Sequence, residues 1–594
     1  DEYANWAVGK GFLMGDAQIP DALVPTVDGL FLQAVKAMHI QITGGSASVR
    51  ATGVYGMRVA GAAAREMLIK AAADEWQVST SELTAENSYI VHAASGQRGE
   101  FAQFAQAAAQ MTPSHTPTLK KPRDFKIMGQ SVARLDIPAK VDGTAQFGID
   151  AVLPGMKHAA IMGAPVFGAQ VVSFDADAAR QMAGVVDVIS LDNAVAVVAE
   201  GYWQAKQALN AVQVEWSETG HEKVSSETLF VQFEKDLQNA RENGSAGEDV
   251  VVGDTAAAFA QADRVVEATY KVPFLAHTTM EPMNATAQVV DEQIEVWVGS
   301  QNPLGFRHEV ADALGVDAAQ VTLHQHMMGG GFGRRATGDV AVQAARLAQA
   351  TGVPVKLIWS REEDVRHDIY RPAVASQFRA ALSADGEVLA WDNLFHEKHE
   401  PAEAPVIPYS VSAQRIAYTD SPTHVPFGPW RSVDHSQHGF FTEGFFDEVA
   451  HAAGKDPYLL RRELLVGKTR HLAVLDRAAE KAGWGESLPA GKGRGISLQE
   501  SFGSLVAQVV DVSVDAGVVS VDKVVCVVDC GFAVSPDGVA AQMVSGISYG
   551  LSAALYGNIE IQEGAVVLGN FHDDTSVRMN DAPDIETHVS LSNA

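Results

Sequence analysis

The sequence predicts a multidomain protein of α/β class (α+β mixed), and three observations lead to this prediction. The chain has 594 residues, which indicates about three to five domains at ordinary domain sizes. Apolar residues make up 47% and charged residues 20%, a balance typical of globular proteins. Short strand-like runs alternate with helix-like stretches over residues 126–226, as they do in α/β units.

The first expected region, residues 1–125, opens with about forty residues in which helix-like pieces alternate with glycine and proline breaks. It ends in a Pro/Lys-rich linker, Ser114–Phe125. Glycine and serine residues from Thr43 to Ser48 precede a helix-like stretch, Met57–Ala73. Such a turn before a helix can bind an anion, or it can act simply as a helix N-cap. Taken alone, the residues favour the N-cap.

The second expected region, residues 126–226, is a compact α/β unit closed by the polar stretch Ser217–Ser226. Its runs are short and rich in β-branched residues, which favours strands over buried helices. Strands are expected at Gln146–Ile149, His158–Met162, Val185–Leu191 and Ala194–Ala199, and helices at Ala176–Met182 and Tyr202–Val212.

The third and fourth expected regions are residues 227–470 and 471–594. In the third, strands are expected at Arg264–Tyr270, Ala285–Val290, Ile294–Val298 and Gln320–Leu323, and helices at Gly305–Leu314 and Asp339–Gln349. Apolar residues recur every four positions from Phe441 to Ala453, which predicts an amphipathic helix that Gly454 ends. In the fourth, strands are expected at Val506–Val514, Val518–Val528 and Ala565–Asn570, and a helix near Ala540–Leu551.

The most informative segment is Met327–Arg335, which reads MMGGGFGRR and lies between an expected strand and an expected helix. Three consecutive glycines are costly in backbone entropy, so they indicate positive φ angles or close approach of the backbone to a ligand. Backbone N–H groups can form an anion-binding concavity there, and Arg334 and Arg335 can add bidentate contacts. The residues favour a loop that grips a large, phosphate-bearing ligand. The alternative is a structural turn with two solvated arginines.

The charge balance argues against nucleic acid as a partner. Lys and Arg total 44 against 73 for Asp and Glu, so the formal net charge is −29, and such a surface repels phosphate backbones. No apolar run reaches the roughly 18 residues of a transmembrane segment. The chain begins at Asp1 with no basic or apolar leader, so we expect a processed or incomplete start.

The chain has two cysteines, Cys526 and Cys530, in one expected strand. Their separation along a strand would be about 13 Å, too far for a disulfide. Two cysteines also cannot ligate an iron–sulfur cluster, so any electrons that this protein handles must leave through another chain.

The glycine loop resembles that of the molybdenum hydroxylases, the xanthine dehydrogenase and aldehyde oxidase group. The form GGGFGRR, and the early position of the Thr43–Ser48 loop, are most similar to the isoquinoline 1-oxidoreductase branch. The resemblance implies a multidomain molybdopterin-binding fold. Residues 1–125 would be the N-terminal part of the cofactor-binding region, 126–226 an α/β hammerhead domain, and 227–470 and 471–594 two molybdopterin-binding domains, the second without its C-terminal end.

The resemblance also implies site residues, carried over position by position. Molybdopterin, in its cytosine dinucleotide form with molybdenum, would contact Gly45, Ser46, Ser48, Gly330, Gly331, Phe332, Gly333, Arg334, Arg431 and Gln542. Gln301 would contact an oxygen on the metal, and the substrate pocket would include Pro429, Trp430 and Val433. Without the resemblance, Gln301 would be a polar strand end and Trp430 a core residue.

The implied activity is hydroxylation of an aromatic N-heterocycle or an aldehyde with water-derived oxygen. Electrons would pass to a small subunit with two [2Fe-2S] clusters. The first alternative is a membrane-associated aldehyde dehydrogenase large subunit that feeds a c-type cytochrome subunit. The second, from another class, is a non-catalytic cofactor-binding or assembly subunit. The family implies a periplasmic or periplasm-facing location, with the cytoplasm as the alternative.

One family feature has no match here. The family's general base is a glutamate in a Gly-x-Gly-Glu-Pro segment, and Glu486, in Trp-Gly-Glu-Ser, has the wrong context. The chain ends about where that segment should begin, so we expect the base on a separate segment or an incomplete chain. The histidine-rich spots, such as His277 with Glu281, lack the H-E-x-x-H spacing. The family holds its metal through the pterin, so no protein-ligated metal site is expected.

Overall fold

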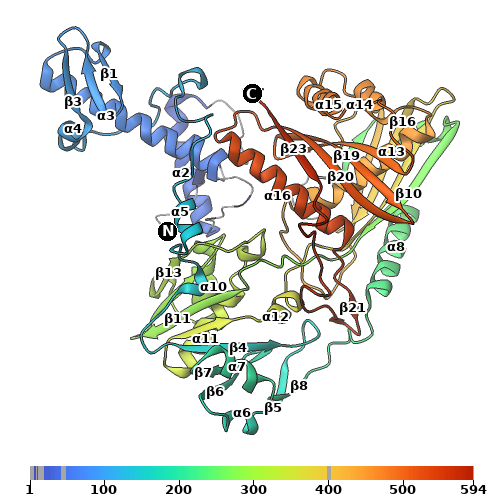
Figure 1. The fold of residues 1–594 in the computed structure, drawn as a ribbon, viewed down its shortest axis with the longest axis horizontal. Coiled ribbons are helices and arrows are strands. Elements are labelled where there is room, and N and C mark those ends of the chain that lie inside the picture. The colour runs from blue at the N-terminus through green and yellow to red at the C-terminus, as the bar shows by residue number, and fades with distance from the viewer. Residues whose placement is uncertain are drawn as a thin grey trace. The chain divides into compact units, whose positions relative to one another are not determined.

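The computed structural model describes residues 6–7, 10, 19–39, 41, 44, 48–397 and 403–592. Its contacts separate two compact units, one of residues 1–128 with 301–308 and one of residues 129–300 with 309–594. Both units combine helices with strands (Figure 1), so the predicted mixed α/β class is confirmed.

The first unit combines helices with a small antiparallel sheet. Its helices include α2 (Val24–Ala37), the π-helix η2 (Ser48–Met57), α3 (Arg58–Trp76) and α4 (Phe101–Ala108), and its sheet joins β1 (Leu83–Glu86), β2 (Tyr89–His92) and β3 (Gln97–Glu100). Phe104 of α4 packs edge to face on Trp76 of α3, with ring centroids 5.3 Å apart, and forms a small core with Ile90. The helix expected over Met57–Ala73 is confirmed as α3.

The largest sheet of the second unit has seven strands in the order β13-β12-β11-β14-β4-β7-β6. They are β4 (Lys157–Gly163), β6 (Val185–Ser190), β7 (Ala194–Ala199), β11 (Asn284–Val290), β12 (Gln293–Val298), β13 (Val321–Gln325) and β14 (Val355–Ile358). Parallel pairing of β14 with β4 unites strands from residues 126–226 and 227–470 in one sheet. Helices α7 (Tyr202–Leu209) and α11 (Asp339–Thr351) pack on it, so the loop between β13 and α11 is anchored at both ends.

One expected strand of this part, Gln146–Ile149, is wrong. The backbone instead forms a short 3-10 helix, η5 (Gly148–Asp150). The Asp150 carboxylate accepts the backbone N–H of Phe147 at 3.0 Å, and this cap removes a donor that a strand would use in its ladder.

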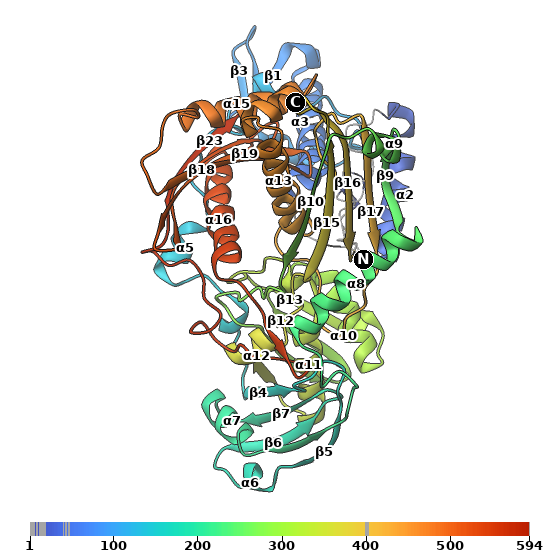
Figure 2. The same ribbon diagram turned by 90° about the vertical axis from the view of Figure 1, so that its right-hand side faces the viewer.

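The second sheet of this unit has five strands and carries the aromatic core. Its order is β10 (Arg264–Val272), β15 (Val374–Leu382), β16 (Val388–His396), β17 (Ala413–Thr419) and β9 (Gly247–Val252). Helix α13 (His435–Ala452) packs on β10 and β15, as Figure 2 shows. Phe441, Phe445 and Val449 of α13 are fully buried against Trp391, so the predicted amphipathic helix is confirmed.

The third sheet has four strands, β18 (Lys492–Ser501), β19 (Ser504–Asp515), β20 (Val518–Asp529) and β23 (Asp584–Ser590). Helix α15 (Thr469–Lys481) packs on β19 and β20, and α16 (Pro536–Leu555) contacts β23. Helix α16 begins earlier than the expected Ala540, because Pro536 at its first position suits a helix start. Ile547 is the buried residue of this apolar helix, so much of its surface lies open.

The strand expected over Ala565–Asn570 is mostly wrong. The structure has a two-residue strand, β22 (Ala565–Val566), paired with β21 (Ile561–Gln562). The Asp573 carboxylate accepts the backbone N–H groups of Gly569 and Asn570 and turns the chain.

The remaining helices of the second unit include α5 (Ile137–Asp142), α6 (Asp177–Arg180), α8 (Ser226–Asn243), α9 (Thr255–Ala260), α12 (Arg361–Arg366) and α14 (Pro457–Leu464). Strands β5 (Val171–Asp175) and β8 (Gln213–Trp216) form a separate pair, and α10 (Pro303–Leu314) runs from residues of the first unit into the second. Among the described residues, no helix is long and apolar enough to cross a membrane.

Candidate functional site

The glycine loop adopts the backbone that its glycines indicate. Gly330 and Gly333 have φ angles of 111° and 118°, and Phe332 between them has a φ of 56°. A Cβ atom at Gly333 would lie 1.6 Å from the carbonyl oxygen of Pro429. The glycine at this position is therefore required by packing of one loop of the protein on another.

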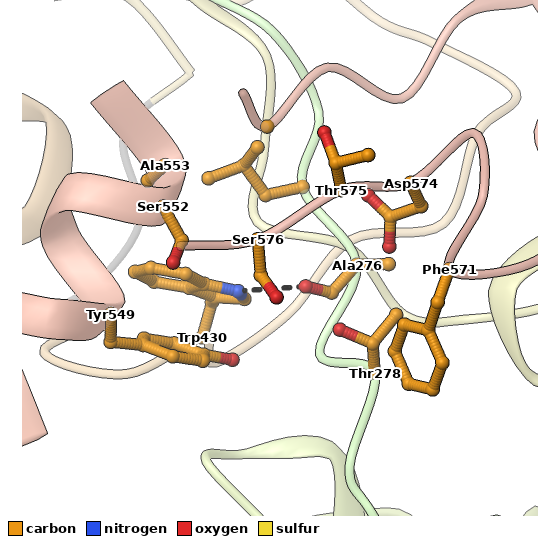
Figure 3. Close-up of a pocket in the computed structure, with 12 residues that line it drawn as sticks. Ala276, Thr278, Trp430, Tyr549, Ser552, Ala553, Phe571, Asp574, Thr575 and Ser576 are labelled. Carbon is orange, nitrogen blue, oxygen red and sulfur yellow. Dashed lines mark hydrogen bonds between the residues drawn. The ribbon is translucent and has the colours of Figure 1, made fainter. Parts of the chain in front are cut away.

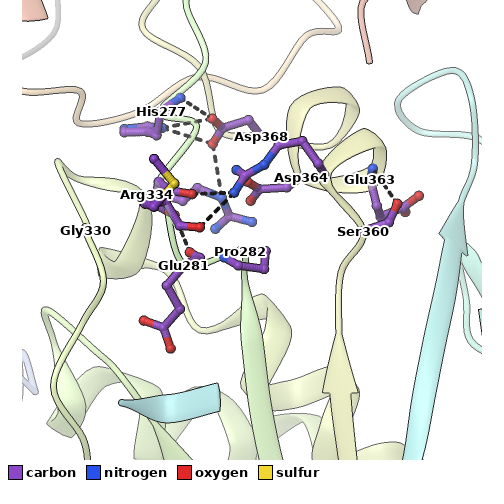
Figure 4. Close-up of polar contacts among 12 residues, drawn as sticks. His277, Glu281, Pro282, Gly330, Arg334, Ser360, Glu363, Asp364 and Asp368 are labelled. Carbon is purple, nitrogen blue, oxygen red and sulfur yellow. Dashed lines mark hydrogen bonds and ion pairs between the residues drawn. The ribbon is translucent and has the colours of Figure 1, made fainter. Parts of the chain in front are cut away.

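The two arginines that follow are buried and paired inside the protein, and Figure 4 shows Arg334 among its partners. The Arg334 guanidinium donates to both carboxylate oxygens of Asp339, at 3.1 and 2.7 Å, and forms an ion pair with Asp368 at 3.0 Å. Burial opposes its charge, yet these carboxylates raise the pKa of Arg334. Arg335 donates to the Gly330 carbonyl at 2.8 Å and to the Glu281 carboxylate at 3.1 Å.

This pairing corrects the expectation that the two guanidinium groups meet a phosphate. A buried charge is stable only with partners, and the partners here are carboxylates of the same chain. The side chain of Arg334 holds the glycine loop against α11 and Asp368, and the expected contact of Arg334 with the cofactor stays a prediction. The alternative of two solvated arginines is wrong as well, because both side chains are buried.

His277 connects the glycine loop to a second loop, Gly428–Val433. Its ring is buried, with Nδ1 3.0 Å from the Asp368 carboxylate and Nε2 3.1 Å from the Pro429 carbonyl. A carbonyl oxygen can only accept, so Nε2 carries a hydrogen and donates to Pro429. His277 therefore links the second loop to Asp368, which pairs with Arg334 of the glycine loop.

The second loop carries Trp430 and Arg431, and both side chains approach Tyr549 of α16. Ser432 and Val433 have φ angles of 68° and 46°, which non-glycine residues adopt rarely and which concentrate at functional sites. The Trp430 ring stacks on Tyr549 of α16, with centroids 4.7 Å apart, and Tyr549 stacks on Phe332 at 4.8 Å. The result is a three-ring stack of Phe332, Tyr549 and Trp430.

Arg431 and Gln542, which the sequence places far apart, meet in the structure. The Arg431 guanidinium donates to the Ser545 hydroxyl at 2.9 Å and to the Gln542 side-chain oxygen at 3.3 Å. Burial lowers the pKa of Arg431. Neither partner, Ser545 or Gln542, carries a charge, so neither balances the positive charge of Arg431.

Tyr549 is a central site residue that the sequence did not predict; Thr278, Phe571 and Asp574 of the neighbouring pocket are others. The Tyr549 hydroxyl donates to the His277 carbonyl at 3.1 Å, and burial raises its pKa, so it stays protonated. A signal was available, because Gln542, Ser545 and Tyr549 recur at intervals of three and four residues and so share one helix face.

A small pocket, with a cavity volume of about 70 Å³, opens beside the three-ring stack. Figure 3 shows Trp430 and Tyr549 on one side and Phe571, Thr278 and Asp574 on the other. The remaining lining residues are Leu275, Ala276, Ser552, Ala553, Gly557, Thr575 and Ser576. Trp430 thus lines a pocket and is also packed, since its Nε1 donates to the Ala276 carbonyl at 3.2 Å.

Of the other expected pocket residues, Pro429 and Val433 lie in the second loop but are not among those that line this pocket. Gly331 is buried within the glycine loop. Gln301 and Ser48 belong to the first unit, where Ser48 begins η2. Gly45 and Ser46 lie outside the described residues.

Comparison with known families defines the class of this protein. Residues 237–465 and residues 477–583 each match a model of a molybdopterin cofactor-binding domain. These two ranges contain the glycine loop, the second loop and α16. The chain is therefore a molybdopterin-binding protein.

Known relatives identify the family. The isoquinoline 1-oxidoreductase beta subunit of Brevundimonas diminuta is 30% identical over 90% of this chain and 76% of its own length. A protein of Gluconacetobacter polyoxogenes named membrane-bound aldehyde dehydrogenase (pyrroloquinoline-quinone) is 32% identical over 92% of this chain and 78% of its own length. The chain belongs to the xanthine dehydrogenase and aldehyde oxidase family of molybdenum hydroxylases.

A solved structure supports the same fold. Quinoline 2-oxidoreductase from Pseudomonas putida 86 matches with a TM-score of 0.69 and 16% identity, over 80% of this chain and 92% of that chain. The domain models and the relatives together identify the chain as a molybdopterin-binding protein of a family of molybdenum-dependent oxidoreductases, as the glycine loop predicted.

Proposed function

We propose that this chain binds molybdopterin cytosine dinucleotide, hydroxylates an aromatic N-heterocycle, and passes the electrons to a small subunit with two 2Fe–2S clusters. The observation that carries the proposal is the three-ring stack of Phe332, Tyr549 and Trp430. It joins the residues expected to hold the pterin to a pocket with aromatic walls.

The surroundings of Arg431 fit a planar, acceptor-rich pterin. Arg431 has no carboxylate partner among the described residues, so its charge is available to an anionic or electron-rich ligand. Among the described residues, the side-chain nitrogen of Gln542 donates no hydrogen bond. This side chain is exposed on α16 and can donate to the ligand. Phe332, 36% exposed, offers a ring edge at the same place.

The residues of this chain bind and orient the pterin and the substrate, and the cofactor supplies the redox chemistry when bound. Arg431 and Gln542 hold the pterin by N–H donors. The rings of Trp430, Tyr549 and Phe571 give the pocket apolar, aromatic walls against which a flat substrate can stack. The Tyr549 hydroxyl, bound to the His277 carbonyl, fixes the orientation of the central ring.

Metal and nucleotide analysis of the purified protein tests the cofactor. We expect molybdenum and, after acid hydrolysis, cytidine monophosphate; guanosine monophosphate would contradict the cytosine form. Turnover of isoquinoline in ¹⁸O-labelled water should place the label in the product. A molybdenum-containing preparation that incorporates oxygen from O₂ instead would overturn the proposed reaction.

A second candidate is an aldehyde dehydrogenase that feeds a c-type cytochrome. The relative from Gluconacetobacter polyoxogenes favours it by its name. The ratio of kcat/KM for isoquinoline to that for acetaldehyde separates the two candidates. The same relative has pyrroloquinoline-quinone in its name, so the hydrolysate should also be examined for that quinone.

The expected partner and location are part of the proposal. The cysteines among the described residues are free, Cys526 buried and Cys530 partly so, which supports cluster ligation by another chain. Co-purification of an iron-containing small subunit checks the partner. Fractionation of the source cells checks the periplasmic location, against the cytoplasmic alternative.

A further inference from the structure

The pocket contains one carboxylate, that of Asp574, on the loop after β22. The loop is held from several sides, since Asp573 accepts the N–H of Asn570 at 2.8 Å and Asn570 donates to Glu362 at 2.8 Å. Farther along, the Val577 N–H donates to Ser552 of α16 at 3.1 Å. Asp574 is therefore positioned by its neighbours, and its carboxylate points into the pocket (Figure 3).

The Asp574 carboxylate accepts no hydrogen bond among the described residues, although its backbone N–H donates to Asn570 and Asp573. Burial, together with the carboxylates of Asp573 and Asp368, raises the pKa of Asp574 to about 6. A partly buried carboxylate without a donor is an unfavourable arrangement that a ligand can relieve. The missing partner is a group that brings a proton.

The walls around this carboxylate select the shape of that ligand. Trp430, Tyr549 and Phe571 supply aromatic faces, and Thr278 adds a hydroxyl beside Phe571 (Figure 3). Flat faces suit an aromatic ring, and their negative π surfaces favour a ring that carries positive charge. An aldehyde without a nitrogen has no proton to offer Asp574.

We propose that Asp574 determines substrate specificity by binding the ring nitrogen of an aromatic N-heterocycle through a shared proton, against the aromatic wall of the pocket. This inference rests on the proposed function and names the residue that selects heterocycles over aldehydes. The complex contains one proton between the carboxylate and the nitrogen, whichever atom holds it more tightly.

The shared proton makes binding depend on pH. Above the pKa values of both Asp574 and the free heterocycle, binding takes up one proton, and the affinity falls about tenfold per pH unit. The charged and titratable groups that face Asp574 are Asp573 of its own loop, Arg361 and Asp368 of the α12 region, and Tyr549 of α16. Of these, Arg361 opposes the rise in the Asp574 pKa.

Calorimetry on the dithionite-reduced holoenzyme, which cannot turn over, tests the proposal with isoquinoline as the probe. Titrations at pH 8 in phosphate and in Tris give the number of protons taken up per ligand. We expect about one proton for the wild type and none for Asp574→Asn. The matched control is Asp581→Asn, which removes an exposed carboxylate nearby in the sequence that does not line the pocket.

Kinetics give the second readout. We expect Asp574→Ala to lower kcat/KM for isoquinoline by about tenfold or more, mainly through KM, and to change kcat/KM for benzaldehyde less than about twofold. Equal losses on both substrates, or proton uptake that persists in Asp574→Asn, would overturn the inference. Wild-type enzyme that contains molybdenum but does not oxidise isoquinoline would instead overturn the proposed function, and the calorimetry would still report on Asp574.

Discussion

The two arginine-bearing loops of the site use their charges in opposite ways. In the glycine loop, Arg334 is fully buried and meets two carboxylates. In the second loop, Arg431 is only partly buried and meets two neutral side chains. The family resemblance assigned both residues to the cofactor, but the charge of Arg334 is paired within the protein and that of Arg431 is not balanced by its neutral partners. The partners of an arginine, more than its place in a motif, decide whether it can bind an external anion.

The largest expected effect comes from breaking the buried pair. Arg334→Met leaves Asp339 and Asp368 without their cation and should lower the free energy of unfolding by ~3–5 kcal/mol. Urea denaturation followed by tryptophan fluorescence measures it. The control is Arg462→Met, which breaks an exposed pair with Asp476 and should cost less than ~1 kcal/mol. Equal costs would mean that burial of the Arg334 network contributes nothing.

The next effect concerns the contact between the loops. Gly333→Ala puts a Cβ atom where the Pro429 carbonyl lies and should cost about 2–4 kcal/mol, with loss of bound molybdenum. Gly315→Ala is the matched control, because Gly315 also has a positive φ, of 68°, but open space around it. That variant should cost about 1 kcal/mol and keep its molybdenum. If the two variants behave alike, the clash with Pro429 is not what requires glycine.

The third effect separates ligand binding from stability. Arg431→Met removes three hydrogen bonds to neutral groups at a partly exposed site and should cost only about 1–2 kcal/mol of stability. Because its charge is available to the cofactor, the variant should contain much less molybdenum than Arg462→Met prepared in parallel. Full molybdenum content, measured per polypeptide, would remove Arg431 from the cofactor site.

The smallest effect is a pH dependence at the pocket. The pKa of Asp574 is about 6 in the folded protein, above its ordinary value of 3.8. Between these values the folded state binds more protons than the unfolded state, so this group's contribution to stability is present at low pH and is lost as pH rises through about 6. Asp574→Asn should therefore raise Tm by about 2 °C at pH 7.5 and leave it unchanged at pH 4. A rise at both pH values would point to a cause other than ionisation.

Several local features could be predicted from the sequence because they depend on neighbours in the chain. The amphipathic helix around Phe441 follows from a four-residue apolar period, and the positive φ of Gly330 and Gly333 follows from the glycines themselves. The strands expected at Gln146–Ile149 and Ala565–Asn570 failed for a local reason too. In each segment an aspartate carboxylate, that of Asp150 or Asp573, caps the backbone. The pattern of apolar residues in a sequence does not reveal such caps.

By itself, the sequence determined the class of the protein, its cofactor-binding family and the backbone of the glycine loop. A short motif both fixes the local backbone geometry and is shared with related proteins. Only the tertiary structure decided which charged side chains pair with one another. Asp368 reaches Arg334 and His277 from another element, and Tyr549 of α16 completes the stack between Phe332 and Trp430. Burial and pairing are properties of the folded whole. Only the structure therefore shows that Arg334 meets two carboxylates, and that the Asp574 carboxylate accepts no hydrogen bond from the residues that the structure describes.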